Sequence, residues 1–251
     1  MKQTHDIRTS ELRVAGWNIH RGRGQDRVVD AERTLRVLCD EVCAQCPDVL
    51  VLEEADEEAR PHRGILDMAR LEQETGLRSV HTLPVRRWSG ESHGFLGVIV
   101  LMAPDFEVEG VTLLDLPGQC HRGAVIVDAR RGGVALRLVG THLSLSQPLR
   151  IVQMRTLGQH LARRQSRPLI VCGDLNEWRP WGGMAFSHTV LGLSLRGPAV
   201  RTFPVGWPVL PLDRILAGEG ARVADARALD GPGIRIASDH RPLLGQVVIG
   251  G

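Results

Sequence analysis

Short apolar runs typical of β-strands recur along the whole chain, and helix-like segments separate them in only part of it. Helical periodicity is found in residues 30–46, 65–74 and 147–165. Between residues 95 and 140, strand-like runs follow one another through tight turns. A chain in which helices separate only some of the strands cannot form a purely parallel sheet, so the pattern predicts α/β layering with mixed sheets.

The length of 251 residues suits one domain with a substantial core, and no repeat or linker divides the chain. Residues 1–11 are expected to form a short disordered tail before the first strand, at 12–19. The other predicted strands cover residues 48–52, 95–102, 106–114, 124–129, 134–140, 168–172, 211–216, 221–229 and 243–248.

Composition limits the cellular context. No apolar run approaches the roughly 20 residues of a membrane span, and the N-terminal segment lacks an apolar signal core. Five cysteines, an odd number, favour free thiols in the cytoplasm. Cys39, Cys43 and Cys46 have a spacing seen at iron–sulfur clusters, but their place on one helix face favours packing. The net charge of +2 does not by itself indicate a polyanionic partner.

Polar side chains that can bind metals or carry protons directly follow several of the apolar runs. Taken singly, each could be a cap or a turn, where Asp and Asn are common. If the strands share a sheet edge, however, these groups converge on one rim, where α/β folds place ligand sites. Asp174 and Asn176 stand two positions apart and would point the same way on a strand. The full set is Asn18, His20, Glu53, Glu54, Thr141, His142, Asp174, Asn176, Asp213, Ser238, Asp239 and His240.

The chemistry of this set favours one kind of site. Carboxylate and carboxamide oxygens suit Mg²⁺ or Mn²⁺ better than zinc, which takes more sulfur and nitrogen ligands. Histidines beside such a cation can transfer protons or donate to phosphate, and a neighbouring carboxylate fixes the tautomer of the imidazole. The combination predicts metal-assisted attack of water on a phosphoryl centre.

Seven segments in order resemble the endonuclease/exonuclease/phosphatase superfamily: WNIH, DVLVLEE, HRGA, GTHLS, CGDLNEW, PLDRI and SDHRP. The resemblance extends from about Leu12 to Val248 and is closest to a deoxyribonuclease-like, small bacterial branch. It implies a single domain in the form of a four-layer α/β/β/α sandwich, with two mixed sheets packed face to face and helices outside.

The resemblance also implies a function for individual residues. His240 would be the general base or acid, oriented by Asp213, while Asp174 and Asn176 would orient the attacking water and the phosphate. His142 would donate to a phosphate oxygen. The implied metal ligands are Asn18, Glu54, Asp174 and Asp239, and the implied substrate contacts are Arg122, His142 and Asn176.

Two positions depart from the family pattern. Glu53 stands where the family usually has glutamine, which makes the site more negative. The chain contains no tyrosine, so the family's phosphate-contacting tyrosine is missing, and whether His93 replaces it stays open.

The preferred interpretation is a divalent-metal-dependent phosphodiesterase, in particular a nuclease. The alternatives are a phosphatase or phospholipase-type hydrolase of a small or lipid phosphate, and a catalytically inactive binding module. The sequence Arg86-Arg87-Trp88 resembles a basic and aromatic nucleic-acid contact, but a single such triplet is more often surface arginines beside one buried ring. The substrate, the number of metal ions and the oligomeric state stay open.

Overall fold

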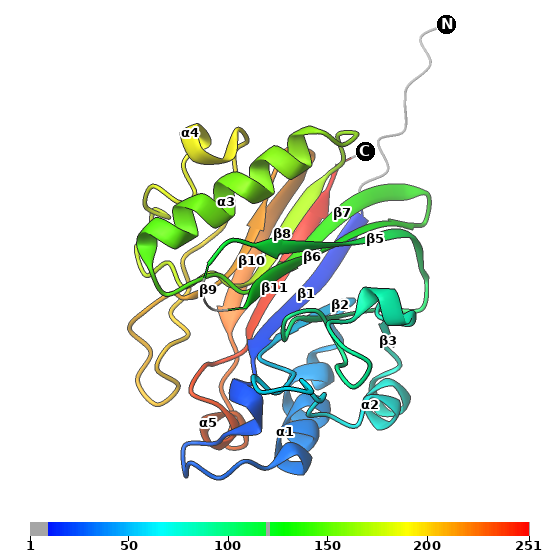
Figure 1. Cartoon of the computed structure of the whole chain (residues 1–251), viewed down its shortest axis with the longest axis vertical. Helices are drawn as coiled ribbons and strands as arrows, with labels where there is room; N and C mark the ends of the chain where they lie inside the picture. Colours follow the sequence, from blue (N-terminus) through cyan, green and yellow to red (C-terminus); the bar gives the residue numbers. More distant parts are fainter. Residues whose placement is uncertain (1–9, 119–120, 251) are drawn as a thin grey trace, which may run out of the picture.

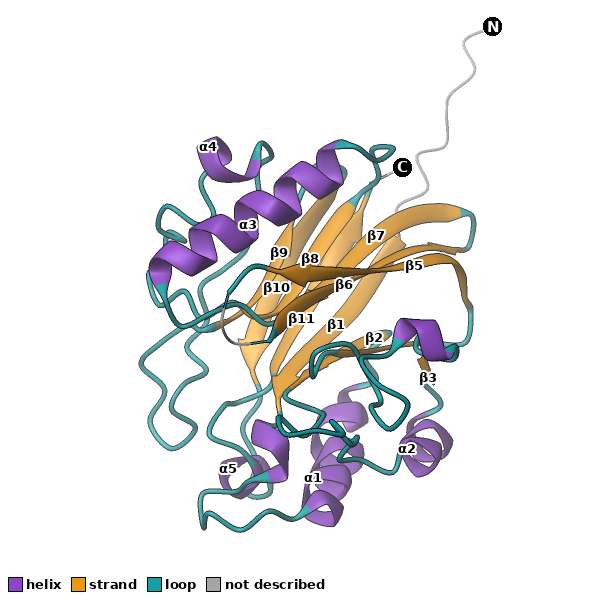
Figure 2. Cartoon of the chain, viewed as in Figure 1, coloured by secondary structure: helices purple, strands orange, loops and turns teal. Residues whose placement is uncertain are grey.

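The computed structural model describes residues 10–118 and 121–250, and it contains two β-sheets packed face to face (Figure 1). The first sheet has six strands in the order β10-β11-β1-β2-β4-β3, and the second has five in the order β5-β6-β7-β8-β9. Each sheet is mixed: β1 is parallel to β2 and antiparallel to β11, and β7 is parallel to β8 and antiparallel to β6. Helices cover the outer faces (Figure 2), so the predicted four-layer sandwich is confirmed.

The elements have the following bounds. The first sheet comprises β1 (Ser10–Asn18), β2 (Val49–Glu53), β3 (Arg78–Ser79), β4 (Ile99–Met102), β10 (Ala221–Ala228) and β11 (Leu243–Ile249). The second comprises β5 (Phe106–Leu116), β6 (Arg122–Arg131), β7 (Val134–Thr141), β8 (Leu169–Asp174) and β9 (Asp213–Ala217). The α-helices are α1 (Ala31–Val37), α2 (Met68–Thr75), α3 (Gln147–Ala162), α4 (His188–Leu191) and α5 (Ile234–Ala237). Short helical turns cover His20–Gly22, Leu38–Val42, Cys43–Gln45 and Pro84–Arg86.

Three apolar clusters fill the spaces between the four layers. Because side chains alternate along a strand, β2 directs Val49 and Val51 into the space between the sheets and Leu50 and Leu52 toward the helices. The inner cluster joins these valines to second-sheet residues such as Ile170. The outer clusters pack the first sheet against α1 and the second sheet against α3. Continuously apolar strands are therefore buried on both faces.

Several sequence-based boundaries need correction. β1 begins at Ser10, which pairs with Ile249, so the strand includes the last two residues of the predicted tail; residues 1–9 lie outside the described residues. The apolar run at 234–236 is the helical turn α5 and not a strand end. Cys46 does not pack on a helix face, because it lies after the helix in a left-handed conformation and is exposed. Within the described ranges, no helix has the length and apolarity needed to cross a lipid bilayer.

The topology brings the predicted site residues to one rim. The parallel pairs β1–β2 and β7–β8 end there, and the Asn18 side chain at the end of β1 contacts Asp174 at the end of β8. β9 is antiparallel to β8 and starts where β8 ends, which pairs Asp213 with Asp174. β11 is antiparallel to β1, so the residues before Leu243, including His240, also lie at this rim. Asp213 thus reaches the rim at the beginning of its strand.

Candidate active site

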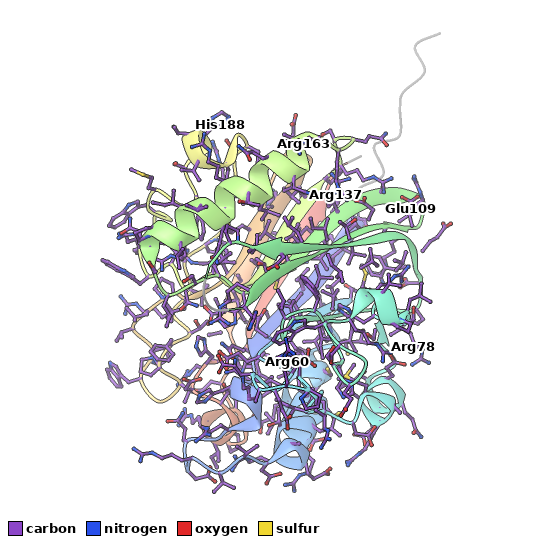
Figure 3. All side chains as sticks on the ribbon, viewed as in Figure 1. Arg60, Arg78, Glu109, Arg137, Arg163 and His188 are labelled. Carbon is purple, nitrogen blue, oxygen red and sulfur yellow. The ribbon has the colours of Figure 1, made fainter. Side chains whose placement is uncertain are left out.

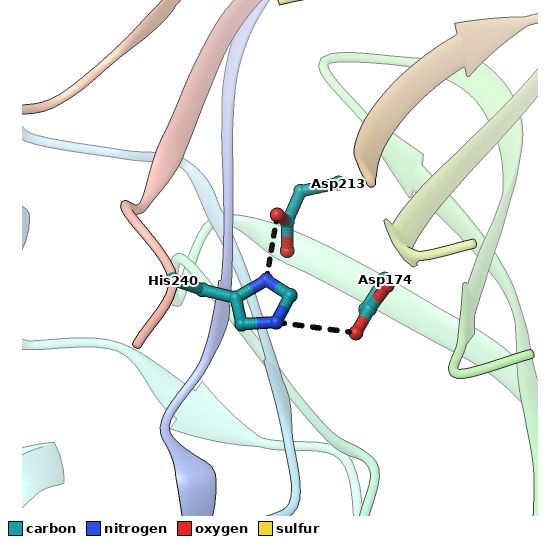
Figure 4. A group of neighbouring side chains, drawn as sticks. All are labelled: Asp174, Asp213 and His240. Atoms are coloured by element: carbon teal, nitrogen blue, oxygen red, sulfur yellow. Dashed lines mark hydrogen bonds and ion pairs between the residues drawn. The ribbon is translucent and has the colours of Figure 1, made fainter. Parts of the chain in front are cut away.

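The centre of the rim is a buried group of two carboxylates and one imidazole (Figure 4). His240 Nδ1 lies 2.9 Å from Asp213 Oδ2, and His240 Nε2 lies 3.8 Å from Asp174 Oδ2. The side chains of both aspartates are only 2% exposed. Among the described residues this is the group whose ligand atoms all lie within 4.8 Å of one another. Asp213 therefore orients the imidazole and leaves Nε2 facing Asp174.

The charges of this group are strongly coupled. Burial disfavours a charged imidazole, but the carboxylates of Asp213 and Asp174 outweigh that effect and raise the pKa of His240 to about 10. Burial also raises the pKa of Asp174 to about 6, against the opposing effect of His240. The group is thus a protonated imidazole held between two carboxylates.

A tight turn after β8, and not strand alternation, brings Asp174 and Asn176 together. β8 ends at Asp174, Asn176 has a positive φ of 51°, and its backbone N–H donates to Asp174 Oδ1 at 3.0 Å. Asp174 Oδ2 accepts a second bond, from Asn18 Nδ2, also at 3.0 Å. Gly173 precedes the turn with φ of 147°, and a Cβ there would lie 1.9 Å from the Thr141 carbonyl oxygen. The local turn fixes one oxygen of the Asp174 carboxylate, and Asn18 at the end of β1 fixes the other.

A buried arginine and glutamate network holds the next part of this turn. Glu177 is fully buried and contacts Arg150 at 3.3 Å and Arg179 at 2.9 Å. Arg214, also buried, donates to the backbone carbonyls of Glu177 and Arg179. Removal of one partner would leave a buried charge unpaired, so these contacts hold the backbone next to Asn176.

His142, the second buried histidine of the rim, has different neighbours. Its Nε2 lies 3.2 Å from Asn176 Nδ2 and 3.4 Å from Asp174 Oδ2. Burial lowers its pKa well below the ordinary value, and the positive charges of Arg122, His240 and Arg21 act in the same direction. His142 is therefore neutral, and Nε2 can accept a hydrogen bond from the Asn176 amide.

Two of the predicted metal ligands lie on the more open side of the site. Glu54 Oε2 forms an ion pair with Arg21 Nη1 at 2.5 Å, and its side chain is 13% exposed. Asp239 Oδ1 lies 3.5 Å from His20 Nδ1, and its side chain is 32% exposed. Both carboxylates thus flank the turn that follows Asn18, and neither belongs to the compact group of Asp174, Asp213 and His240.

Arg122 and His93 have different relations to the site. The side chain of Arg122, the first residue of β6, has no hydrogen bond or ion pair with the described residues, and its Nε is buried. Its side chain lines one cavity with Glu54 and His142. His93 packs against Gly64 and is not among the residues that line this cavity. The position of His93 therefore does not favour it as a replacement for the missing tyrosine.

Glu53 is fully buried at the end of β2, and neither of its carboxylate oxygens has a hydrogen-bond partner in the described part of the chain. Burial raises the pKa of Glu53 well above the ordinary value, and the charges of Asp213 and Asp174 add to the effect. The additional carboxyl group that the sequence predicts here, Glu53 in place of a glutamine, therefore lies in the buried part of the site.

Sequence reasoning missed three contacts of the site. Thr202 Oγ1 donates a short hydrogen bond to Asp213 Oδ2, and Thr202 lies in a proline-rich loop that carries no local signal for this function. Arg21, in the turn after Asn18, was not among the predicted site residues, yet it pairs with Glu54. Ser238 Oγ donates to the Asn18 carbonyl and fixes the segment before His240.

Comparisons with known proteins identify the family and related folds. The model of the Endonuclease/Exonuclease/phosphatase family matches residues 15–240. An Escherichia coli K12 relative, the uncharacterized protein YbhP, is 27% identical over a 211-residue alignment that covers 72% of this chain and 83% of YbhP.

Two solved structures have a similar fold. An endonuclease/exonuclease/phosphatase from Beutenbergia cavernae is 23% identical with a TM-score of 0.66, over 96% of this chain and 72% of that one. The D. rerio TDP2 structure, a complex with a single-strand DNA product, is 16% identical with a TM-score of 0.66, over 95% of this chain and 99% of that one. At these identities the likeness concerns the fold.

Proposed function

Because the chain belongs to the Endonuclease/Exonuclease/phosphatase family, we propose that it is a divalent-metal-dependent phosphoesterase that hydrolyses phosphodiester bonds by attack of activated water. The observation that carries the proposal is the buried arrangement in which Asp213 orients His240 and His240 Nε2 faces Asp174. A histidine held this way can take a proton from water or give one to a leaving oxygen.

The residues of the rim fit a divalent cation. Asn18, Glu54, Asp174 and Asp239 offer hard oxygen atoms, as Mg²⁺ and Mn²⁺ require. Burial raises the pKa values of Glu53 and Asp174, and the charge of Asp213 adds to the effect at both; a bound cation would oppose this shift. When bound, such an ion would polarise a phosphoryl oxygen and stabilise the charge on the leaving oxygen.

The chain's own residues would divide the remaining work. Arg122, His142 and Asn176 would contact the phosphate, since the Arg122 guanidinium has no partner among the described residues, Arg122 and His142 line one cavity, and Asn176 contacts His142. With its pKa raised to about 10, His240 is ready to donate a proton. To accept one from water, it needs the charge of Asp174 to be offset, which lowers the pKa toward neutrality.

Among phosphodiesters, we propose a nucleic acid as the substrate class. The TDP2 structure of this fold is a complex with a single-strand DNA product, and the Arg122 guanidinium, which has no partner within the described ranges, can contact a backbone phosphate. Hydrolysis of a small or lipid phosphate is the alternative, and the compact group around His240 argues against an inactive binding module. Cys39, Cys43, Cys46 and Cys172 are free, which suits a cytoplasmic location.

The test is a substrate panel with Mg²⁺, Mn²⁺ or a chelator. It should contain single-stranded and duplex DNA, abasic DNA, RNA, bis-p-nitrophenyl phosphate, inositol phosphates and sphingomyelin. We expect metal-dependent cleavage of a nucleic acid and its loss in Asp174→Ala with the fold intact by circular dichroism. Turnover by Asp174→Ala at the wild-type rate would refute the assignment, and turnover of inositol phosphates or sphingomyelin alone would favour the alternative.

A further inference from the structure

Three aromatic rings gather beside the candidate active site, on loops distant in sequence. The rings of His62 and Trp88 are stacked with centroids 3.4 Å apart, and the ring of His121 lies 4.9 Å from Trp88 and 6.2 Å from His62. Arg60, labelled in Figure 3, lies on the same loop as His62. His62 and Trp88 are half-buried, and His121 is exposed. We call these three rings the aromatic ledge.

Backbone contacts hold the ledge in place. His62 N–H donates to the Ala59 carbonyl, and the ring Nδ1 lies 3.3 Å from the Glu57 carbonyl. Trp88 N–H donates to the Gly94 carbonyl, and the adjacent Ser89 hydroxyl donates to the Pro61 carbonyl at 2.6 Å. The two loops are therefore joined, and the rings are ordered before any ligand arrives. An ordered aromatic surface binds with a small loss of conformational entropy.

The ledge and the phosphate-handling residues line the same cavity. Trp88 and His121 contribute to its wall together with Arg122, His142 and Glu54. His121 directly precedes Arg122, whose guanidinium has no partner among the described residues. A phosphate that contacts Arg122 therefore places its own substituent against Trp88 and His121.

The charges of the cavity select the kind of substituent. Glu57 and Glu58 also line it, and Arg21, which lines it too, is already paired with Glu54 and Glu58. A second phosphate, as in an inositol polyphosphate, would therefore be repelled by carboxylates. Leu96 and the ledge offer too little apolar surface for an acyl chain. A nucleobase fits both features, because its flat face stacks on aromatic rings and its amino edge can donate to carboxylates.

We infer that the aromatic ledge binds the nucleobase of the nucleotide whose phosphate contacts Arg122. The inference rests on the proposed hydrolysis of nucleic acid phosphodiesters and specifies how that substrate is recognised. It also makes Trp88 a substrate contact, and not only a surface or packing residue.

The test compares two single-stranded oligonucleotides that differ at the nucleotide beside the cleaved bond, which carries either a base or a tetrahydrofuran abasic unit. We expect the wild type to prefer the base-containing oligonucleotide in kcat/KM, and Trp88→Ala to reduce this preference by about 5- to 150-fold, the range of one base stacked on an aromatic ring. Trp88→Phe should keep part of the preference. The matched control is Trp181→Ala, which removes an exposed tryptophan outside the cavity and should leave it unchanged.

A binding measurement separates failure of this inference from failure of the proposed function. If the wild type cleaves no oligonucleotide, the proposed function fails, and calorimetry with a nucleoside monophosphate and ribose 5-phosphate still tests the ledge. Weaker binding of only the nucleoside monophosphate to Trp88→Ala supports the inference. Equal preference in wild type and Trp88→Ala overturns it, as does binding of phenyl phosphate as tight as that of the nucleoside monophosphate.

Discussion

The two buried histidines of the candidate active site both lie near Asp174, but their other charged neighbours differ. His240 is placed between the carboxylates of Asp213 and Asp174, which raise its pKa to about 10 despite burial. His142 has the amide of Asn176 at its Nε2, and burial together with the charge of Arg122 lowers its pKa well below the ordinary value. Burial is similar, with side chains 7% and 3% exposed. The partners, and not the burial, therefore decide which histidine is charged.

The topology explains this difference. His240 precedes β11 and faces the junction of β8 and β9, where two aspartates are paired across the ladder. His142 follows β7, which is hydrogen-bonded to β6, the strand that carries Arg122 at its start. Under the proposed function, one side of the rim would move protons and the other side would hold phosphate with neutral and cationic donors.

The largest effect is expected when the charged histidine is removed. Substitution His240→Gln keeps a polar side chain but cannot transfer a proton, so kcat should fall by about 10³- to 10⁴-fold. Steady-state hydrolysis of a phosphodiester with Mg²⁺ measures the loss. The control is His188→Gln, which changes an exposed histidine on α4 (Figure 3) and should leave kcat unaltered. A small loss in His240→Gln would mean that another group carries the proton.

A smaller effect is expected for the neutral histidine. His142→Gln should lower kcat/KM by about 10²-fold, the size of one lost hydrogen bond to a developing oxyanion. Because His142 stays neutral throughout the working pH range, the shape of the pH–rate profile should not change. NMR of histidine-labelled, metal-free protein should show His142 neutral at pH 7 and His240 protonated. A protonated His142 at that pH would contradict the proposed difference in charge between the two histidines.

The sequence predicted the rim because strand ends and their polar residues are local features. The ends of β1, β2, β7 and β8, with Asn18 and Asp174 among their residues, lie where apolar runs stop. Asp213 was also predicted at the rim, but it begins its strand and does not end one. Two other features could not be found this way: α5 is a single helical turn, and the pairing of Glu54 with Arg21 depends on how the turn after β1 is placed.

The sequence also could not predict that one histidine is protonated and the other neutral. Both stand beside an apolar run, and both match family motifs. Their pKa values depend on residues far away in the chain: Asp213 for His240, and Arg122 for His142. The aromatic ledge has the same property, since His62, Trp88 and His121 meet only in the folded chain. Local patterns predict elements, whereas electrostatics depends on tertiary contacts.

The smallest expected effect tests whether the part of the rim around His240 contains more negative charge than its basic groups balance. Glu53 is buried without a partner, and burial, then Asp213 and Asp174, raise its pKa. A carboxyl group whose pKa is raised in the folded state contributes its full stability at pH values below its pKa in the unfolded state, near 4.5. This contribution is lost as the pH rises toward the pKa of the group in the folded state.

Glu53→Gln should therefore stabilise the metal-free protein at pH 8, by about 1–3 kcal/mol, and have less effect at pH 4. Urea unfolding at both pH values measures the difference. Glu57→Gln alters an exposed carboxylate four residues away and should leave stability within about 0.5 kcal/mol. Equal stability of Glu53→Gln and wild type at pH 8 would show that the buried carboxyl groups are balanced without a cation. In that case the high pKa of His240 would need a cause other than excess carboxylate charge.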